Sequence, residues 1–272
     1  MKYMKIFCLL LSIWLMATVG LTGCDQTGEQ SPSDTTAAVT ETTEPTTTPE
    51  SSNPDDTTTA DLYATAMQDA VFADESEIRE LVTITKESDM VTWNEDGTKV
   101  LMLSWHRYPD SYQAGQSFTC AYGEVWVFTD REILAWYEDN ADGVTDWTLR
   151  LEQLIGLPEN KGYTHVSAFW VDTNEMIRPA YVTDITAQIT PSSLDASALG
   201  DYKDWFDGNI IWSYFDSAYP WTRLGYTYDW GNGGDEYGLS EFIILPDSEI
   251  EVAWTVSMDT FLTMLSEGDL QP

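Results

Sequence analysis

The residues best suited to ligand chemistry lie in one stretch near the C-terminal end, residues 219–241, where aromatic and polar residues alternate before a Gly-rich acidic loop. If residues 224–230 form a strand, alternate side chains share one face. Three aromatic rings on that face could stack against a sugar or an apolar ligand, unless they belong to the core. The candidate ligand-binding residues are a neighbouring arginine and these three aromatics: Arg223, Tyr226, Tyr228 and Trp230.

Two acidic segments carry oxygen ligands of the kind that calcium takes, six to eight at a time. The first is the Gly-rich loop, with Asp229, Asn232, Asp235 and Glu236. The second opens like a calcium loop, with Glu138, Asn140 and Asp142. Neither completes the EF-hand pattern, and in the second Leu149 stands where a bidentate glutamate belongs. Calcium binding and a solvated acidic turn therefore stay open as alternatives, and the sequence requires no cofactor.

Paired carboxylates are the other candidate chemistry, since glycoside hydrolysis needs only two at a set separation. Among many acidic residues, Glu124 and Glu241 are the pair to test. His106 and His165 could each form a small polar site, and Cys120 could be a nucleophile or a buried apolar residue. The chain has no G-x-S-x-G elbow, no H-E-x-x-H helix and no Gly-rich phosphate loop with lysine. An enzyme is therefore the less favoured class.

The N-terminus predicts export. Two lysines precede an apolar run, residues 6–19, which has the length of a signal peptide and is short for a membrane span. The next residues, Leu21-Thr22-Gly23-Cys24, resemble the lipobox of bacterial lipoproteins. The resemblance implies that residues 1–23 are removed and that Cys24 carries lipid, which anchors the chain to a membrane and faces it outside the cytoplasm, at the cell surface or in the periplasm.

Residues 24–60 are predicted to be a disordered stalk that begins at the lipidated cysteine. Beyond Cys24 they are rich in Thr, Ser, Pro and acidic residues and hold a single branched aliphatic residue, Val39. Such a segment buries too little apolar surface to offset the entropy of ordering it. The globular domain is expected to span residues 61–272, and its single cysteine, Cys120, rules out an internal disulfide in the mature domain.

The globular part is predicted to be α+β, a single domain with a largely antiparallel sheet and flanking helices. Periodicity and capping residues predict helices over 61–71, 74–85, 131–138, 147–155, 201–217 and 258–265. Alternation predicts strands at 123–129, 163–171 and 224–230, with hairpins pairing 90–94 with 98–106 and 240–245 with 249–256. Asp130 and Asp146 are expected to cap the helices that follow them.

Several segments of the globular part resemble a pattern that recurs in secreted bacterial proteins: RLEQLIGLP, SAFWVD followed by Arg178-Pro179, YPWTRLGYTYDWG and GLSEFII. The resemblance implies no activity. A formal charge of −34 over 272 residues argues against binding nucleic acid. We therefore expect a lipid-anchored binding or interaction protein for envelope polysaccharide or a basic protein partner; the alternative is a cell-surface hydrolase that cleaves glycans with paired carboxylates.

Overall fold

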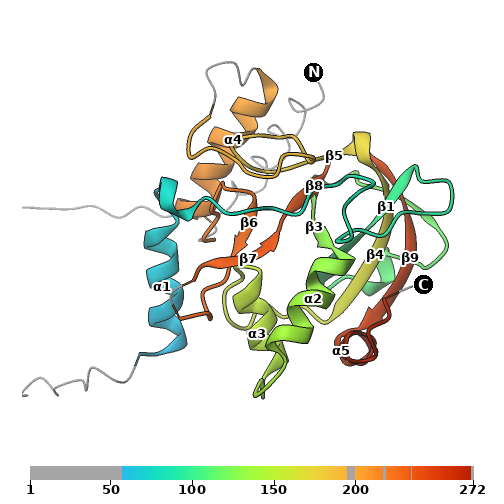
Figure 1. Ribbon diagram of the computed structural model, residues 1–272, viewed down its shortest axis with the longest axis horizontal. Helices are drawn as coiled ribbons and strands as arrows, with labels where there is room; N and C mark the ends of the chain where they lie inside the picture. Colours follow the sequence, from blue (N-terminus) through green and yellow to red (C-terminus); the bar gives the residue numbers. More distant parts are fainter. Residues whose placement is uncertain (1–56, 195–199, 217–218, 234, 271–272) are drawn as a thin grey trace, which may run out of the picture. The chain divides into compact units, whose positions relative to one another are not determined.

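The computed structural model describes residues 57–194, 200–216, 219–233 and 235–270 (Figure 1). These residues form a seven-stranded sheet, a separate two-stranded sheet and five α-helices. Every neighbouring pair of strands is antiparallel. The predicted α+β class with an antiparallel sheet is therefore confirmed. None of the helices in the described ranges is long and apolar enough to cross a bilayer.

The helices are α1 (Thr59–Asp69), α2 (Asp130–Asn140), α3 (Trp147–Leu154), α4 (Asp201–Ile211) and α5 (Met258–Glu267). A π-helical turn, Trp212–Asp216, continues α4. The large sheet has the spatial order β2 (Ser117–Thr119), β9 (Glu249–Ser257), β4 (His165–Asp172), β1 (Lys99–His106), β3 (Val125–Thr129), β8 (Phe242–Ile244) and β5 (Met176–Ile177). The small sheet pairs β6 (Tyr226–Tyr228) with β7 (Tyr237–Ser240).

Strand β1 lies in the middle of the large sheet and is buried on both faces. Leu101 and Leu103 pack with residues of α2, α3 and α5 in one apolar cluster. Val100 and Met102 point to the opposite face and pack with side chains of β8 and β9 in a second cluster. The two-residue period of the strand thus joins the helical layer to a second core. Figure 1 shows α2 and α5 lying against this sheet.

Local sequence signals gave several elements correctly. The side chain of Asp146 accepts a hydrogen bond from the backbone N–H of Leu149, as a helix cap should. Ser257 caps α5 through Thr260, and α5 ends at Gly268 in the left-handed conformation. At the start of α2 the cap is Thr129 instead of the predicted Asp130, whose buried carboxylate accepts hydrogen bonds from Thr92.

The predicted helix over 74–85 is wrong. Asp74 and Glu77 form a reciprocal capping box around one 3₁₀ turn, Glu75–Glu77, and the chain then runs extended. The backbone N–H of Leu81 donates to Gln188, and that of Ile84 donates to Ile185. These pairings with a distant segment satisfy the backbone outside a helix, so tertiary contacts override the helical spacing of the apolar residues.

Two predicted hairpins are also wrong in part. The turn at residues 94–97 forms, and Trp93 bridges Val100 of β1, but no strand forms over residues 90–94. The backbone N–H of Asn94 donates to Lys99, and that of Leu101 donates to Thr92. Strands β8 and β9 do not pair with each other, because β8 lies between β3 and β5 while β9 lies between β2 and β4. The strand expected at 224–230 is limited to β6, and the helix expected at 201–217 ends in the π-helical turn. Thr59 and Ala60, which were predicted to belong to a disordered stalk, lie in helix α1 instead.

Candidate functional site

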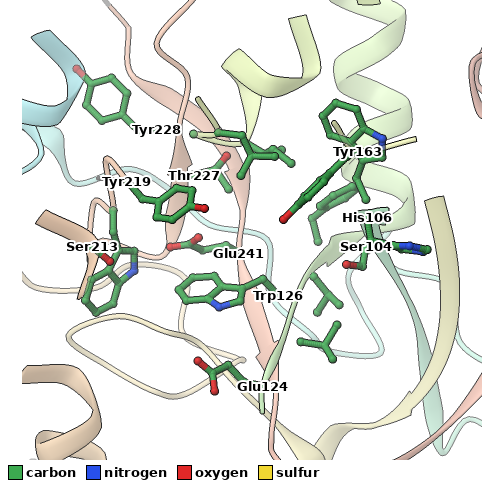
Figure 2. Close-up of a pocket in the computed structure, with 18 of the residues that line it drawn as sticks. Ser104, His106, Glu124, Trp126, Tyr163, Ser213, Tyr219, Thr227, Tyr228 and Glu241 are labelled. Carbon is green, nitrogen blue, oxygen red and sulfur yellow. The ribbon is translucent and has the colours of Figure 1, made fainter. Parts of the chain in front are cut away.

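A cavity of about 420 Å³ lies between the large sheet and the segments that pack beside β3. Its walls come from β1, β3, residues 155–157 after α3, α4 with its π-helical turn, and residues 219–228. Glu241, between β7 and β8, also belongs to the lining, as do Tyr108, Tyr112 and Tyr163. Figure 2 shows the carboxyl group of Glu241 near Tyr219 and Trp126. Small-molecule sites usually have volumes of ~300–1,000 Å³, so this cavity is large enough for a small ligand.

The cavity is rich in aromatic residues, since eleven of the described residues that line it are Trp, Tyr or Phe. Trp126 and Trp212 are 37% and 58% exposed, so both rings are accessible to a ligand. Trp221 is buried, and its ring centroid lies 6.4 Å from that of Trp126 at an interplanar angle of 89°. One of the two exposed rings, that of Trp126, therefore packs edge-on against a buried ring of the cavity wall.

Glu241 is the most unusual group in the cavity. Glu241 is only 7% exposed, and its Oε1 atom has no hydrogen-bond partner among the described residues. Burial raises the pKa of Glu241 well above the usual value, although the charge of Arg178 and the indole of Trp221 act in the opposite direction. A buried carboxyl group without a partner is costly, and such groups are enriched at functional sites.

Two further unpartnered polar atoms belong to residues of the same cavity. The indole Nε1 of Trp105 and the amide Nδ2 of Asn209 are buried and have no acceptor in the described part of the chain. Both are hydrogen-bond donors, whereas the Oε1 of Glu241 is an acceptor when ionised. Unsatisfied buried groups are few in native proteins, so their concentration around one cavity indicates a polar ligand or ordered water.

Arg178 supplies a buried cation next to the cavity, but two carboxyl groups share it. It is fully buried, and its guanidinium donates to the carbonyl oxygens of Val82 and Gly225 at 2.8 and 3.2 Å. Its pKa is lowered to about 10 by burial and is raised in turn by the charges of Glu132 and Glu241, among others. Burial raises the pKa of Glu132 to about 7. One arginine therefore interacts with the charges of two acids, the buried Glu241 and the half-buried Glu132.

His106 lines the cavity as an uncharged group. Its Nδ1 accepts a hydrogen bond from the backbone N–H of Tyr108 at 3.0 Å, so Nε2 carries the proton and donates to Ser167 at 2.7 Å. The hydroxyl of Ser167 in turn contacts Thr255, which donates to the carbonyl of Tyr112. Burial lowers the pKa of His106 to about 4, and the charge of His165 adds to this effect. The ring is therefore a structural part of the wall and not a general base.

Cys120 is a core residue. It is 1% exposed, and burial raises the pKa of its thiol to about 11. Since the thiolate is the reactive form, this cysteine is not an activated nucleophile. Of the two interpretations of Cys120, the structure supports the buried apolar residue.

Both carboxylates chosen from the sequence, Glu124 and Glu241, line the cavity. Glu124 is half-buried and directly precedes β3, whereas Glu241 is buried. In the view of Figure 2 the ring of Trp126 lies between the two carboxyl groups. The structure therefore brings the predicted pair to one site with two different environments, one open to solvent and one enclosed.

The predicted stacking face, by contrast, is buried. Tyr228 and Trp230 pack against α1, and the ring of Tyr63 meets that of Trp230 edge-on at 5.5 Å. Tyr226 is fully buried, although it and Tyr228 still form part of the cavity wall. Arg223 donates twice to the backbone carbonyls that follow α1, both at 2.8 Å. The expectation of an open platform is thus incorrect, because α1 covers this face.

Asp229 has a different role from the predicted calcium ligand. Its side chain is fully buried and forms a two-fold hydrogen-bonded ion pair with Arg150 of α3, at 2.9 and 2.6 Å. It also accepts the backbone N–H of Gly231 at 3.0 Å. Both carboxylate oxygens of Asp229 accept hydrogen bonds from protein donors, so Asp229 links residues 229–231 to α3 and is not a free metal ligand.

The second predicted calcium loop, which begins at Glu138, starts inside helix α2. Glu138 and Asn140 lie in the last turn of α2, where the backbone is helical, and Asp142 follows in an exposed turn. Asn140, Asn232 and Asp235 do come together around another hollow of about 380 Å³. The structure thus unites members of both acidic segments, but Asn140 donates to its own helix and Asp235 accepts from Tyr237.

A group of three carboxylates that could hold a metal ion lies elsewhere, at Asp69, Glu77 and Glu236. One oxygen from each lies within 4.8 Å of the others. Burial raises the pKa of Glu236 to about 7, and the charges of Glu77 and Asp69 raise it further. The hydrogen bond that Tyr226 donates to Glu236 lowers this pKa, but by less than the other effects raise it. Only Glu236 of the predicted calcium ligands belongs to this group.

No protein-family model matches the chain, and neither a curated protein nor a solved structure matches it. The fold and the cavity therefore carry the functional argument. Sequence reasoning missed Trp126, Asn209 and Trp105. The first could have been found, because a strand places Trp126 on the same face as Glu124 two residues earlier. Nothing in the spacing of Asn209 marks it. The lipidation site predicted at Cys24 lies outside the described residues.

Proposed function

We propose that the chain is a lipid-anchored, extracytoplasmic binding protein whose cavity holds one unit of an envelope polysaccharide. The observation that carries this proposal is the cavity itself, where accessible aromatic rings surround three buried polar atoms that lack partners. Sugar units match this combination, because they offer an apolar C–H face to the rings and hydroxyl groups to the polar atoms.

The anchor and the stalk support the same proposal. A lipid on Cys24 would hold the chain at a membrane, and the segment up to residue 57 would let the domain reach into the surrounding envelope. The domain is strongly acidic, so electrostatic attraction would favour ligands or partners that carry positive charge. We therefore expect the ligand to be a polymer of the envelope.

The test is binding of the full chain to envelope polysaccharides, followed by intrinsic Trp fluorescence. We expect Trp126→Ala to weaken binding about tenfold, since stacking on an aromatic ring is worth ~0.5–1.5 kcal/mol beyond burial. Tyr122→Ala is the matched control, because Tyr122 is 98% exposed and does not line the cavity. Equal loss of binding in both variants would contradict the proposal.

Glycan hydrolysis is the second candidate function, and the raised pKa of Glu241 specifically favours it. A carboxylic acid that keeps its proton can donate it to a glycosidic oxygen, and Glu124 in the same cavity could activate water. Release of reducing ends would reveal this activity. We expect Glu241→Gln and Glu124→Gln each to abolish it; activity that survives both changes would exclude these two residues.

We further infer that the three-carboxylate group binds calcium. Three acidic side chains from separate segments supply oxygen ligands, which calcium prefers. Millimolar calcium should then raise the unfolding temperature of the full chain more than magnesium at equal ionic strength, because an ion bound only to the folded state stabilises it. The same shift with Glu236→Gln, or no difference between the two ions, would contradict a calcium site there.

A further inference from the structure

The charges around the cavity identify the ligand more closely. We propose that the cavity takes a sugar unit bearing a protonated amine, with the ammonium group against Glu241 and hydroxyl groups against Asn209 and Trp105. This inference rests on the proposed function, and it adds the chemical class of the bound unit. It comes from three features of the cavity: its charge, its unpartnered atoms and its aromatic rings.

The described lining of the cavity has acidic side chains and no matching basic ones. The two residues with ionisable acidic side chains that line it, Glu124 and Glu241, are not matched by any Lys or Arg among its described lining residues. His106 adds no positive charge, because its ring is held neutral by its hydrogen bonds and by burial. A ligand with its own positive charge would supply the cation that the described lining lacks, whereas an anionic ligand would find no lysine or arginine in that lining to pair with.

The nearest buried cation does not fill this role. Arg178 lies close enough to influence Glu241, but it also faces Glu132, and neither carboxylate forms an ion pair with it among the described residues. Its hydrogen bonds go to backbone carbonyls. With both acids ionised the group would carry one excess negative charge. An ammonium group in the cavity would balance it.

The unpartnered atoms specify the rest of the ligand. Glu241 Oε1 requires a hydrogen-bond donor, which an N–H of an ammonium group provides. Trp105 Nε1 and Asn209 Nδ2 require acceptors, which sugar hydroxyl oxygens provide. A simple alkylamine offers the ammonium donor but no hydroxyl acceptors, and a neutral sugar offers hydroxyl groups but no charge. An amino sugar offers both.

The aromatic rings favour the same ligand. The faces of Trp and Tyr attract cations within about 6 Å of the ring centroid. They also stack against the apolar face of a sugar ring. Figure 2 shows Trp126 beside Glu241, and Trp212 also lines the cavity. The ring of Tyr219 already has the ammonium of Lys161 4.6 Å from its centroid, so Trp126 and Trp212 are the rings that a sugar bearing an amine can use.

Binding of an ammonium group should release protons. The empty cavity favours the protonated form of Glu241, while a bound cation favours the ionised form. The other groups that act on Glu241 are Arg178 and the indole of Trp221, and Glu241 in turn raises the pKa of Tyr214. Arg178 and Tyr214 keep their protons at neutral pH, so the released proton would come from Glu241.

The experiment compares a β-1,4-linked glucosamine tetramer with the fully N-acetylated tetramer, by calorimetric titration of the full chain. The pH is chosen so that the free amine is fully protonated. We expect the glucosamine tetramer to bind at least tenfold more tightly and to release protons, which titrations in two buffers of different ionisation enthalpy would detect. A tetralysine peptide serves as a third ligand and should bind more weakly than the amino-sugar tetramer.

Glu241→Gln should reduce the affinity for the glucosamine tetramer at least tenfold and remove the proton release, with little change for the N-acetylated tetramer. Glu249→Gln is the control, because it removes one charge from an exposed position on β9. Equal affinity of wild type for both tetramers would overturn this inference and leave the proposed function standing. Tighter binding of tetralysine than of the glucosamine tetramer would overturn the assignment of a sugar ligand. If none of the three ligands binds, both this inference and the proposed function are overturned. If Glu241→Gln fails to fold, the comparison of ligands on wild type decides.

Discussion

Replacing Arg150 with methionine should leave a buried carboxylate without its cation. Asp229 is fully buried, the side chain of Arg150 is 14% exposed, and the two pair through hydrogen bonds of 2.9 and 2.6 Å. The guanidinium also lies 4.8 Å from the centroid of Trp136. Methionine retains much of the apolar packing, so the substitution chiefly removes the charge and its donors.

The expected cost follows from that burial. Removing one partner of a buried ion pair typically costs ~3–5 kcal/mol, because the remaining charge stays desolvated. For a domain of this size each kcal/mol corresponds to a shift of ~2–4 °C, so the unfolding temperature should fall by about 6–20 °C. The double variant Arg150→Met/Asp229→Asn removes the stranded charge and should recover part of the loss, because a neutral amide costs less to bury than an unpaired carboxylate.

Chemical denaturation of the full chain, followed by circular dichroism, would measure these differences. Asp229→Asn alone should cost less than Arg150→Met, because Arg150 can still reach solvent. A loss below ~1 kcal/mol in Arg150→Met would mean that the pair behaves like an exposed one. A double variant as unstable as Arg150→Met would show that the charge is not the cause. With either result, the buried charge of Asp229 would not account for the loss of stability.

Three further predictions concern single residues. Burial raises the pKa of Glu236 from 4.5 to about 7, so the folded state binds this proton more tightly than the unfolded state does. Relative to Glu236→Gln, the wild type should therefore lose stability as the pH rises between these values. Urea denaturation of both proteins at pH 5 and pH 8 would measure this loss. Iodoacetamide should label Cys120 only after unfolding, and peptide mapping that finds native Cys120 labelled would contradict its burial. Gly238→Ala should cost ~1–3 kcal/mol, because a Cβ there would lie 2.3 Å from Thr227 Oγ1. Gly208→Ala, with no atom within 4 Å of the added Cβ, should be neutral or stabilising in thermal unfolding.

The elements that sequence reasoning predicted well are those with local determinants. Asp146 and Ser257 mark helix starts through side chains that bond the backbone three residues later. The helix expected over 74–85 failed because Leu81 and Ile84 pair with a segment about a hundred residues away. The pairing of β8 with β3 likewise depends on long-range packing, which neighbouring turn residues do not encode.

The same distinction explains the site. Glu124 and Glu241 were chosen as acids near strands, and the fold brings both to one cavity. Tyr228 and Trp230 have the alternation of an open face, yet α1 covers them, and nothing in their own segment shows where α1 lies. Asp229 resembles a metal ligand until Arg150 is seen to occupy both of its oxygens. Composition identifies candidate chemistry, while burial decides which candidates remain accessible.

A crystal structure of the protein grown with the glucosamine tetramer would show directly whether the cavity binds an amino sugar. We expect one sugar unit inside the cavity, with a donor within hydrogen-bond distance of Glu241 Oε1 and a ring face against Trp126. A tetramer bound elsewhere on the surface, with the cavity holding only water, would contradict it.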